Sequence, residues 1–176
     1  MNEIERLIDN IQSDKPEELR KKAFYELIKI DDDKIPLLIR YKDQNAAEVL
    51  REIGYPRVKN YLYELLVWLQ DVNWPGSTVI ADFLVEVGEP IIPYIKLAFK
   101  EYDSIWHLWI LSYVVSKWPY ELVKELENEL IYFIKSFDKN NIAEGVDIEA
   151  AEIVIKNNLG DIEDIKNTMR NKNHII

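Results

Sequence analysis

The chain has 176 residues, enough for one domain, because a single hydrophobic core typically serves about 100–200 residues. Apolar residues make up 48% of the sequence, which is ample for a packed core. Acidic residues outnumber basic ones by 32 to 22, and the resulting net charge of −10 would repel a phosphate backbone, so nucleic acid binding is disfavoured.

The first ten residues lack the basic region and long apolar core of a secretory signal, so the sequence predicts cytoplasmic residence. The densest apolar stretch, Ile105–Val115, is interrupted by His107 and Ser112 and is shorter than the roughly 20 residues that cross a bilayer. We expect it to form a buried helix, with no membrane association. The absence of cysteine excludes disulfides, thiolate metal sites and thiol nucleophiles.

Apolar residues recur at helical spacing along most of the chain and predict five antiparallel helix pairs, at about residues 16–41, 45–70, 75–101, 104–137 and 147–170. The two clearest patterns, at 58–69 and 122–137, each predict one continuous helix with one apolar face. The first three intervals between pair starts are close to thirty residues, which is typical of a repeat array. The polar run at 138–141 predicts a loop that lengthens the last interval.

Start and stop signals support this division into short helices. Asp14 with Glu17, and Asn45 with Glu48, have the spacing of capping boxes. Gly54 and Gly88 stand where a left-handed residue would end a helix. Four prolines suit the first turn of a following helix: Pro56, Pro75, Pro90 and Pro119.

Three of the predicted pairs share small or apolar residues at spacings of three, which allow two helices to pack closely: Phe24–Ile30, Ala47–Pro56 and Ala81–Pro93. The run Val87-Gly88-Glu89-Pro90-Ile91-Ile92-Pro93-Tyr94-Ile95 resembles the HEAT repeat, in a compact variety with a short period. This resemblance implies an all-α fold of the HEAT-like α–α superhelix type, a short right-handed solenoid of about five antiparallel helix pairs.

A more particular resemblance lies in two tryptophan-rich runs, Leu65-Leu66-Val67-Trp68-Leu69-Gln70-Asp71-Val72-Asn73-Trp74-Pro75 and Ile105–Tyr113. They are similar to domain of unknown function 5071, a family of small bacterial helical-repeat proteins. The resemblance covers residues 58–137 and does not explain residues 1–55 and 138–176. We expect a single domain over 1–176 in which these two parts are flanking helical extensions. The resemblance implies a fold and no catalytic residues.

The sequence offers little for catalysis. Five scattered glycines give no phosphate-binding loop, and the two histidines, His107 and His174, are far apart. His107 follows Asp103 and Ser104 by one helical turn, but these two are better explained as capping residues. Acidic clusters such as Asp31–Asp33 lack calcium-loop spacing and are typical of helix ends. We therefore expect no catalytic residue, no metal site and no cofactor.

Aromatic residues concentrate in the middle of the chain, and they have two interpretations. Most are expected in the core, but tryptophan and tyrosine also dominate protein interfaces, where they bury a large area and keep a polar group. The candidate binding residues are Trp68, Gln70, Asp71, Asn73, Trp74, Trp106, His107 and Trp109.

The sequence favours a non-catalytic protein-interaction module that binds a basic protein partner, because a helical array offers an extended surface and this one is acidic. An immunity-type protein that neutralises a basic toxin is one version, which rests on analogy alone. Two alternatives stay open. One is an enzyme or small-ligand binder that uses the central aromatic region and an acid such as Asp71 or Asp103. The other is a HEAT-type nucleic-acid binder, which the net charge disfavours.

Overall fold

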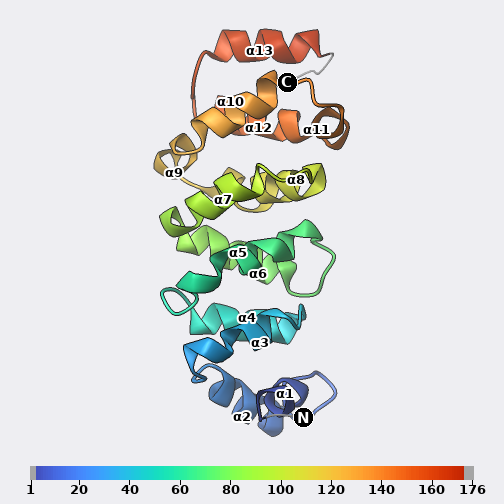
Figure 1. Ribbon diagram of the computed structural model, residues 1–176, viewed down its shortest axis with the longest axis vertical. Helices are drawn as coiled ribbons and strands as arrows, with labels where there is room; N and C mark the ends of the chain where they lie inside the picture. Colours follow the sequence, from blue (N-terminus) through green and yellow to red (C-terminus); the bar gives the residue numbers. More distant parts are fainter. Residues whose placement is uncertain (1–2, 173–176) are drawn as a thin grey trace. The chain divides into compact units, whose positions relative to one another are not determined.

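The computed structural model describes residues 3–172, and this part of the chain is helical without a β-strand (Figure 1). The all-α prediction is thereby confirmed. No helix in the described part is both long and apolar enough to cross a membrane. The chain folds as two compact units that divide between Phe83 and Leu84, within helix α6.

The first unit is built from short helices around a core of aliphatic side chains. Its 3₁₀ helices are η1 (Asp32–Lys34), η2 (Lys59–Tyr61) and η3 (Val67–Gln70). Its α-helices are α1 (Glu3–Asn10), α2 (Glu17–Leu27), α3 (Ile35–Ile39), α4 (Gln44–Ile53), α5 (Leu62–Leu66) and the first part of α6 (Ser77–Val87). Helix α1 packs against α2 and α3, and α3 packs against α4. Their contacts completely bury Leu27, Leu38 and Leu50.

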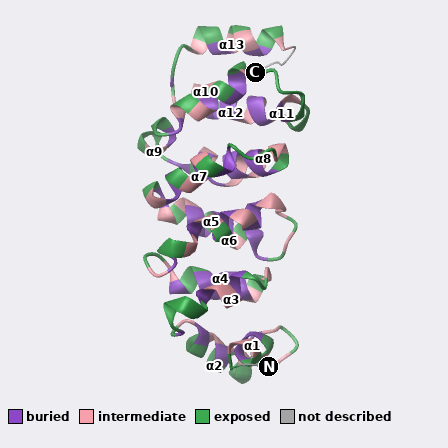
Figure 2. Cartoon of the chain, in the orientation of Figure 1, coloured by how far each residue is buried: buried purple, intermediate pink, exposed green. Residues whose placement is uncertain are grey.

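The second unit is organised around α12, which contacts α8, α10, α11 and α13. The 3₁₀ helices here are η4 (Glu89–Ile91) and η5 (Val115–Lys117). The α-helices are α7 (Ile92–Ala98), α8 (Ser104–Tyr113), α9 (Tyr120–Lys124), α10 (Glu127–Lys135), α11 (Lys139–Glu144), α12 (Val146–Lys156) and α13 (Ile162–Asn171). The buried Ala150 and Ala151 allow neighbouring helices to approach α12 closely. Figure 2 shows how buried and exposed stretches alternate along these helices.

Several predicted helix signals are confirmed. Gly54 and Gly88 follow the last residues of α4 and α6 and have φ of +70° and +68°, a region that glycine enters without steric cost. Pro90 lies in the first turn of η4. The Asp103 carboxylate accepts a hydrogen bond from the Trp106 amide at 3.0 Å and so caps α8.

Other start signals were wrong by a few residues. Pro16, not Asp14, precedes α2, so the first predicted capping box does not form. Helix α4 starts before Asn45, and Asp43 is its cap, accepting from the Ala46 amide at 2.8 Å. Pro56 and Pro75 lie in turns rather than in first helical turns, and Pro119 stands one residue before α9.

Both helices predicted as continuous are interrupted. Residues 58–69 form η2, α5 and η3, because apolar residues at spacings of three and four suit a 3₁₀ helix as well as an α-helix. Residues 122–137 break between α9 and α10 at Leu126, whose φ of −106° and ψ of 8° leave the helical range. Val123 and Leu126 are both completely buried, whereas Phe137, expected on the apolar face, lies exposed beyond α10.

The run at 138–141 is the start of a helix, not a loop. The Asp138 carboxylate accepts hydrogen bonds from the amides of Asn140 and Asn141, both at 2.9 Å, and Gly145 in the left-handed conformation ends α11. A capping aspartate satisfies amides that a helix leaves without partners, so a polar run can still begin a helix. Helix α1 was also missing from the predicted pairs.

Candidate functional site

A cavity of about 440 Å³ in the second unit combines buried polar atoms with exposed aromatic side chains. His107 on α8, Glu129 on α10 and Asn141 on α11 all line it, together with residues that follow α7. A smaller cavity of about 50 Å³ also borders His107 and Asn141. Three helices that are separate in sequence therefore bring their polar side chains to one place.

His107 lies at the floor of this cavity and is only 4% exposed. Asp103 caps α8, so His107 lies one helical turn after the start of that helix. The His107 Nε2 atom lies 3.1 Å from the carbonyl oxygen of Ala98, the last residue of α7. Carbonyls at a helix end lack partners within the helix, so His107 Nε2–H satisfies one of them. This bond leaves Nδ1 as the acceptor nitrogen of the neutral ring.

Two phenylalanine rings enclose the imidazole. The ring centroids of Phe99 and Phe133 lie 5.6 Å and 5.2 Å from that of His107, and the two phenylalanines meet edge to face at 5.0 Å. Burial in this apolar surrounding lowers the pKa of His107, and the Ala98 carbonyl, Asn141 and Asp103 only partly oppose it. The ring is therefore uncharged at neutral pH.

Three buried polar atoms around the cavity make no hydrogen bond of normal geometry: His107 Nδ1, Asn141 Oδ1 and Glu129 Oε2, although the Asn141 side chain and the Glu101 carbonyl lie near enough to His107 to oppose the lowering of its pKa. Asn141 is 8% exposed, and its backbone N–H donates to Asp138 Oδ1 at 2.9 Å. The other carboxylate oxygen of Glu129 lies 3.5 Å from Lys96 Nζ. Buried polar groups normally have partners, so three unpartnered acceptors in one cavity point to a group that completes them.

The rim of the cavity is aromatic and mainly acidic. Tyr102 and Tyr132 line it and are both exposed to solvent. The two cavities that meet at His107 are bordered by four carboxylate side chains, Glu101, Asp103, Glu129 and Asp138, against two lysines, Lys96 and Lys100. Exposed tyrosines around a desolvated floor are typical of the places where partner side chains bind strongly.

The residues predicted as a binding site fall into the two different units. Trp68, Gln70, Asp71, Asn73 and Trp74 belong to the first unit, whereas Trp106, His107 and Trp109 belong to the second. Trp106 is buried, and the half-buried Trp109 packs edge to face on Tyr113 at 5.8 Å. Of these eight residues, His107 lines the cavity described here.

The tryptophan-rich run in the first unit forms a structured turn between η3 and α6. Asp71 Oδ1 accepts from the backbone and side-chain nitrogens of Asn73, at 2.9 and 3.0 Å. The Ser77 hydroxyl donates to the Trp68 carbonyl at 3.1 Å and lies 3.2 Å from the Asp71 carbonyl. Trp68 is completely buried, and half-buried Gln70 ends η3. These contacts indicate that most side chains of the run stabilise the fold.

Trp74 makes the one unusual contact of this run. Lys42 Nζ lies 3.2 Å from the centroid of its ring, a cation–π contact. Burial lowers the pKa of Lys42, and the nearby Asp71 carboxylate opposes the change. Lys42 thus occupies one face of the Trp74 ring.

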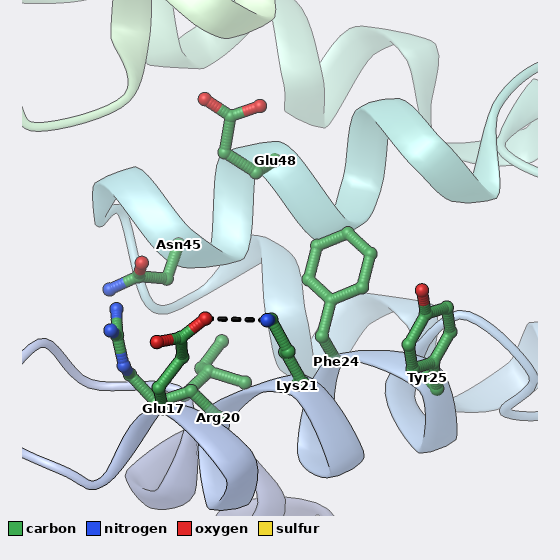
Figure 3. A pocket seen from close by; sticks show the side chains of 8 residues that line it. Glu17, Arg20, Lys21, Phe24, Tyr25, Asn45 and Glu48 are labelled. Carbon is green, nitrogen blue, oxygen red and sulfur yellow. Dashed lines mark ion pairs between the residues drawn. The ribbon is translucent and has the colours of Figure 1, made fainter.

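A second pocket, of about 370 Å³, lies between α2 and α4 in the first unit (Figure 3). Phe24 and Tyr25 border it, and Figure 3 shows Glu17 paired with Lys21 across its floor, at 2.5 Å. Glu48 on α4 accepts a hydrogen bond from Gln44 at 3.0 Å. Glu17 and Lys21 bind one another, and Arg20 Nε is the buried polar atom of this pocket that has no hydrogen-bond partner, against three such atoms around the His107 cavity, so this pocket makes a weaker case for a ligand.

Sequence reasoning missed most of the His107 cavity. Asn141 was assigned to a loop, and Glu129 was not among the candidate site residues. The exposed Tyr102 and Tyr132 carry no sequence signal that separates them from core aromatics. Among the described residues, no group of three or more histidine, aspartate or glutamate side chains is placed to hold a metal ion.

The model of the family described as Domain of unknown function (DUF5071) matches residues 40–154. The chain belongs to this family. The matched part of this DUF5071 protein contains both the turn at Asp71 and the whole His107 cavity, and it is wider than the 58–137 region expected from the sequence. Neither a curated protein nor a solved structure matches the chain.

Proposed function

We propose that this DUF5071 protein is a non-catalytic protein-interaction module that binds a basic protein partner at the His107 cavity. The observation that carries the proposal is the set of three unpartnered buried acceptors beneath exposed tyrosines. A partner that supplies hydrogen-bond donors and positive charge would satisfy these acceptors, whereas an acidic partner would not.

The charge of the whole chain supports the same partner. A net charge of −10 accelerates association with a basic protein and opposes association with an acidic one or with nucleic acid. The immunity-type version, in which the partner is a basic toxin, belongs to this proposal and rests on analogy. Cytoplasmic residence is also part of it and is tested by cell fractionation.

We also infer that the helix pairs are HEAT-like repeats that stack as a short right-handed solenoid. Pair starts near 16, 45, 75 and 104, close to thirty residues apart, support this arrangement. Small-angle scattering from the whole chain tests it, since a rigid stack of repeats gives an elongated distance distribution and a compact globule of the same mass does not.

A small-ligand binder is the second candidate function, because the cavity volume of about 440 Å³ lies within the range of about 300–1,000 Å³ common for small-molecule sites. The enzyme version is weaker. The nearest acidic residues are helix caps, since Asp103 caps α8 and Asp138 caps α11. Neither orients His107, so the base would lack the third group that catalytic sites use.

The test of the proposed function is affinity capture on the immobilised protein at low and high salt, followed by binding measurements with the purified captured protein. A basic partner whose affinity falls steeply with salt supports the proposal. An acidic partner, or a small molecule that occupies the His107 cavity, contradicts it.

A matched pair of double variants separates the effect of charge at the cavity on binding from the effect of the net charge of the chain. The variant Glu101→Gln with Glu129→Gln removes two carboxylates at the cavity. The control Glu18→Gln with Glu52→Gln removes two exposed carboxylates in the first unit. The first pair should weaken binding more than the second. Equal effects would mean that net charge alone governs binding.

A further inference from the structure

The three unpartnered acceptors of the His107 cavity indicate which chemical group of a partner would bind there. We propose that this cavity is a receptor for an arginine side chain of the partner, whose guanidinium donates to His107 Nδ1, Asn141 Oδ1 and Glu129 Oε2. This inference rests on the proposed function, because it names the group through which the basic partner is recognised.

Three buried acceptor atoms around the floor of the cavity make no hydrogen bond of normal geometry. The bond from His107 Nε2 to the Ala98 carbonyl uses the ring's only N–H, so Nδ1 presents a lone pair. Glu129 Oε2 remains unpartnered although Lys96 approaches the other oxygen of the same carboxylate. A ligand with several N–H donors and no acceptor therefore fits, and guanidinium has five N–H donors and no acceptor.

The aromatic walls favour guanidinium over ammonium. Phe99 and Phe133 pack around the imidazole, and Tyr132 lies at the rim. A guanidinium is planar and weakly hydrated, and it stacks on aromatic faces, whereas a lysine ammonium is compact and strongly hydrated. The apolar stem of an arginine would lie against these rings as its charge reaches the acceptors.

Local charge agrees with this assignment. Glu101 after α7, Asp103 at the start of α8, Glu129 on α10 and Asp138 before α11 border the two cavities that meet at His107. The opposing charges, Lys96 and Lys100, come from the end of α7 and the turn after it. Lys96 already contacts Glu129, so the balance around the acceptors remains negative.

The experiment is an NMR titration of the full chain with three short neutral-capped peptides that differ at one residue, arginine, lysine or citrulline. Citrulline has the shape of arginine without its charge. We expect the arginine peptide to bind at least about tenfold more tightly than the citrulline peptide, because a charged donor group is lost. The lysine peptide should bind with intermediate affinity, and amide shifts should gather at residues 96–107 and 128–141.

Variants locate the site. Glu129→Gln keeps the shape of a partly exposed side chain and should reduce the preference for arginine over citrulline several-fold. His107→Phe should do the same by removing Nδ1. Because this change also removes the bond to Ala98, its fold is checked from the amide spectrum, and Glu129→Gln stands alone if the histidine variant unfolds. Glu17→Gln, at the pocket between α2 and α4, is the control and should leave the preference unchanged.

The outcomes separate this inference from the proposed function. If basic proteins bind but arginine and citrulline peptides do not differ, or Glu129→Gln has no effect, the arginine assignment is wrong and the proposed function stands. If Asn141→Leu lowers only stability and leaves peptide preference intact, Asn141 merely supports His107 and the three-acceptor receptor is overturned. Failure to bind any basic protein overturns both.

Discussion

Replacing Lys172 by methionine should destabilise the second unit strongly. Lys172 Nζ lies 3.0 Å from Asp147 Oδ2, and the two side chains are 1% and 0% exposed. The same ammonium donates to the Ser136 carbonyl at 2.5 Å. Lys172 follows α13, Asp147 begins α12 and Ser136 follows α10, so one charged group joins three segments.

The expected loss is about 3–5 kcal/mol, because removing one partner of a buried ion pair is strongly destabilising. For a chain of this size, each kcal/mol lowers Tm by roughly 2–4 °C, so Tm should fall by roughly 6–20 °C. Chemical denaturation and calorimetry of Lys172→Met measure both quantities. Replacing Asp147 by leucine in the same chain should restore much of the loss, because the double variant buries no charge.

The control is Lys135→Met. Lys135 pairs with Asp164 at 2.8 Å and also joins α10 to α13, but these side chains are 52% and 51% exposed. A pair in solvent contributes about 0–1 kcal/mol, so this variant should be nearly neutral. If Lys172→Met costs no more than Lys135→Met, the buried pair does not hold α13 and the reasoning fails.

Three further predictions concern single positions. Gly76→Ala should lower the free energy of unfolding by about 2–5 kcal/mol, because φ is +87° and a Cβ would lie 2.6 Å from Ala47 Cβ. Gly145→Ala, at φ +80° with open space around it, should lower it by only about 1–2 kcal/mol, as measured by denaturation. Glu149→Gln should raise Tm at pH 7 and lose this advantage near pH 4. Burial raises the pKa of Glu149, so the stability that this group contributes is lost as pH rises above the unfolded pKa of 4.5. A Tm difference that does not change with pH would contradict this. Burial lowers the pKa of His107, so as pH falls below the unfolded pKa of 6.5 the unfolded chain takes up the proton first. The free energy of unfolding then falls, by up to about 1.4 kcal/mol per pH unit. His107→Phe should flatten this part of the stability profile, and an identical profile in the variant would refute the assignment.

Local helix signals could be read from the sequence where a single residue decides the backbone. Gly54 and Gly88 stop helices because their positive φ suits glycine, and Asp103 caps α8 because its carboxylate reaches the Trp106 amide. The break at Leu126 could not be read in this way. Apolar spacing across 122–137 is continuous, and neither a glycine nor a proline marks the interruption.

The candidate site was harder to predict because it depends on contacts between distant segments. His107 was identified as a residue of interest, yet its neighbours were taken from its own helix. The structure instead places Phe99, Phe133 and Asn141 around it, from the end of α7, from α10 and from α11. The tryptophan-rich run attracted attention by its composition, but Asp71, Asn73 and Ser77 form a turn with their own backbone.

The central claim is that the His107 cavity receives a cationic group of a basic partner. The most direct measurement is a structure of the protein with its captured partner, by crystallography or by NMR with intermolecular distances. The account predicts a partner guanidinium within hydrogen-bond distance of His107 Nδ1, with Tyr102 and Tyr132 at the contact. A partner seated elsewhere on the chain, with His107 Nδ1 still unpartnered, would contradict it.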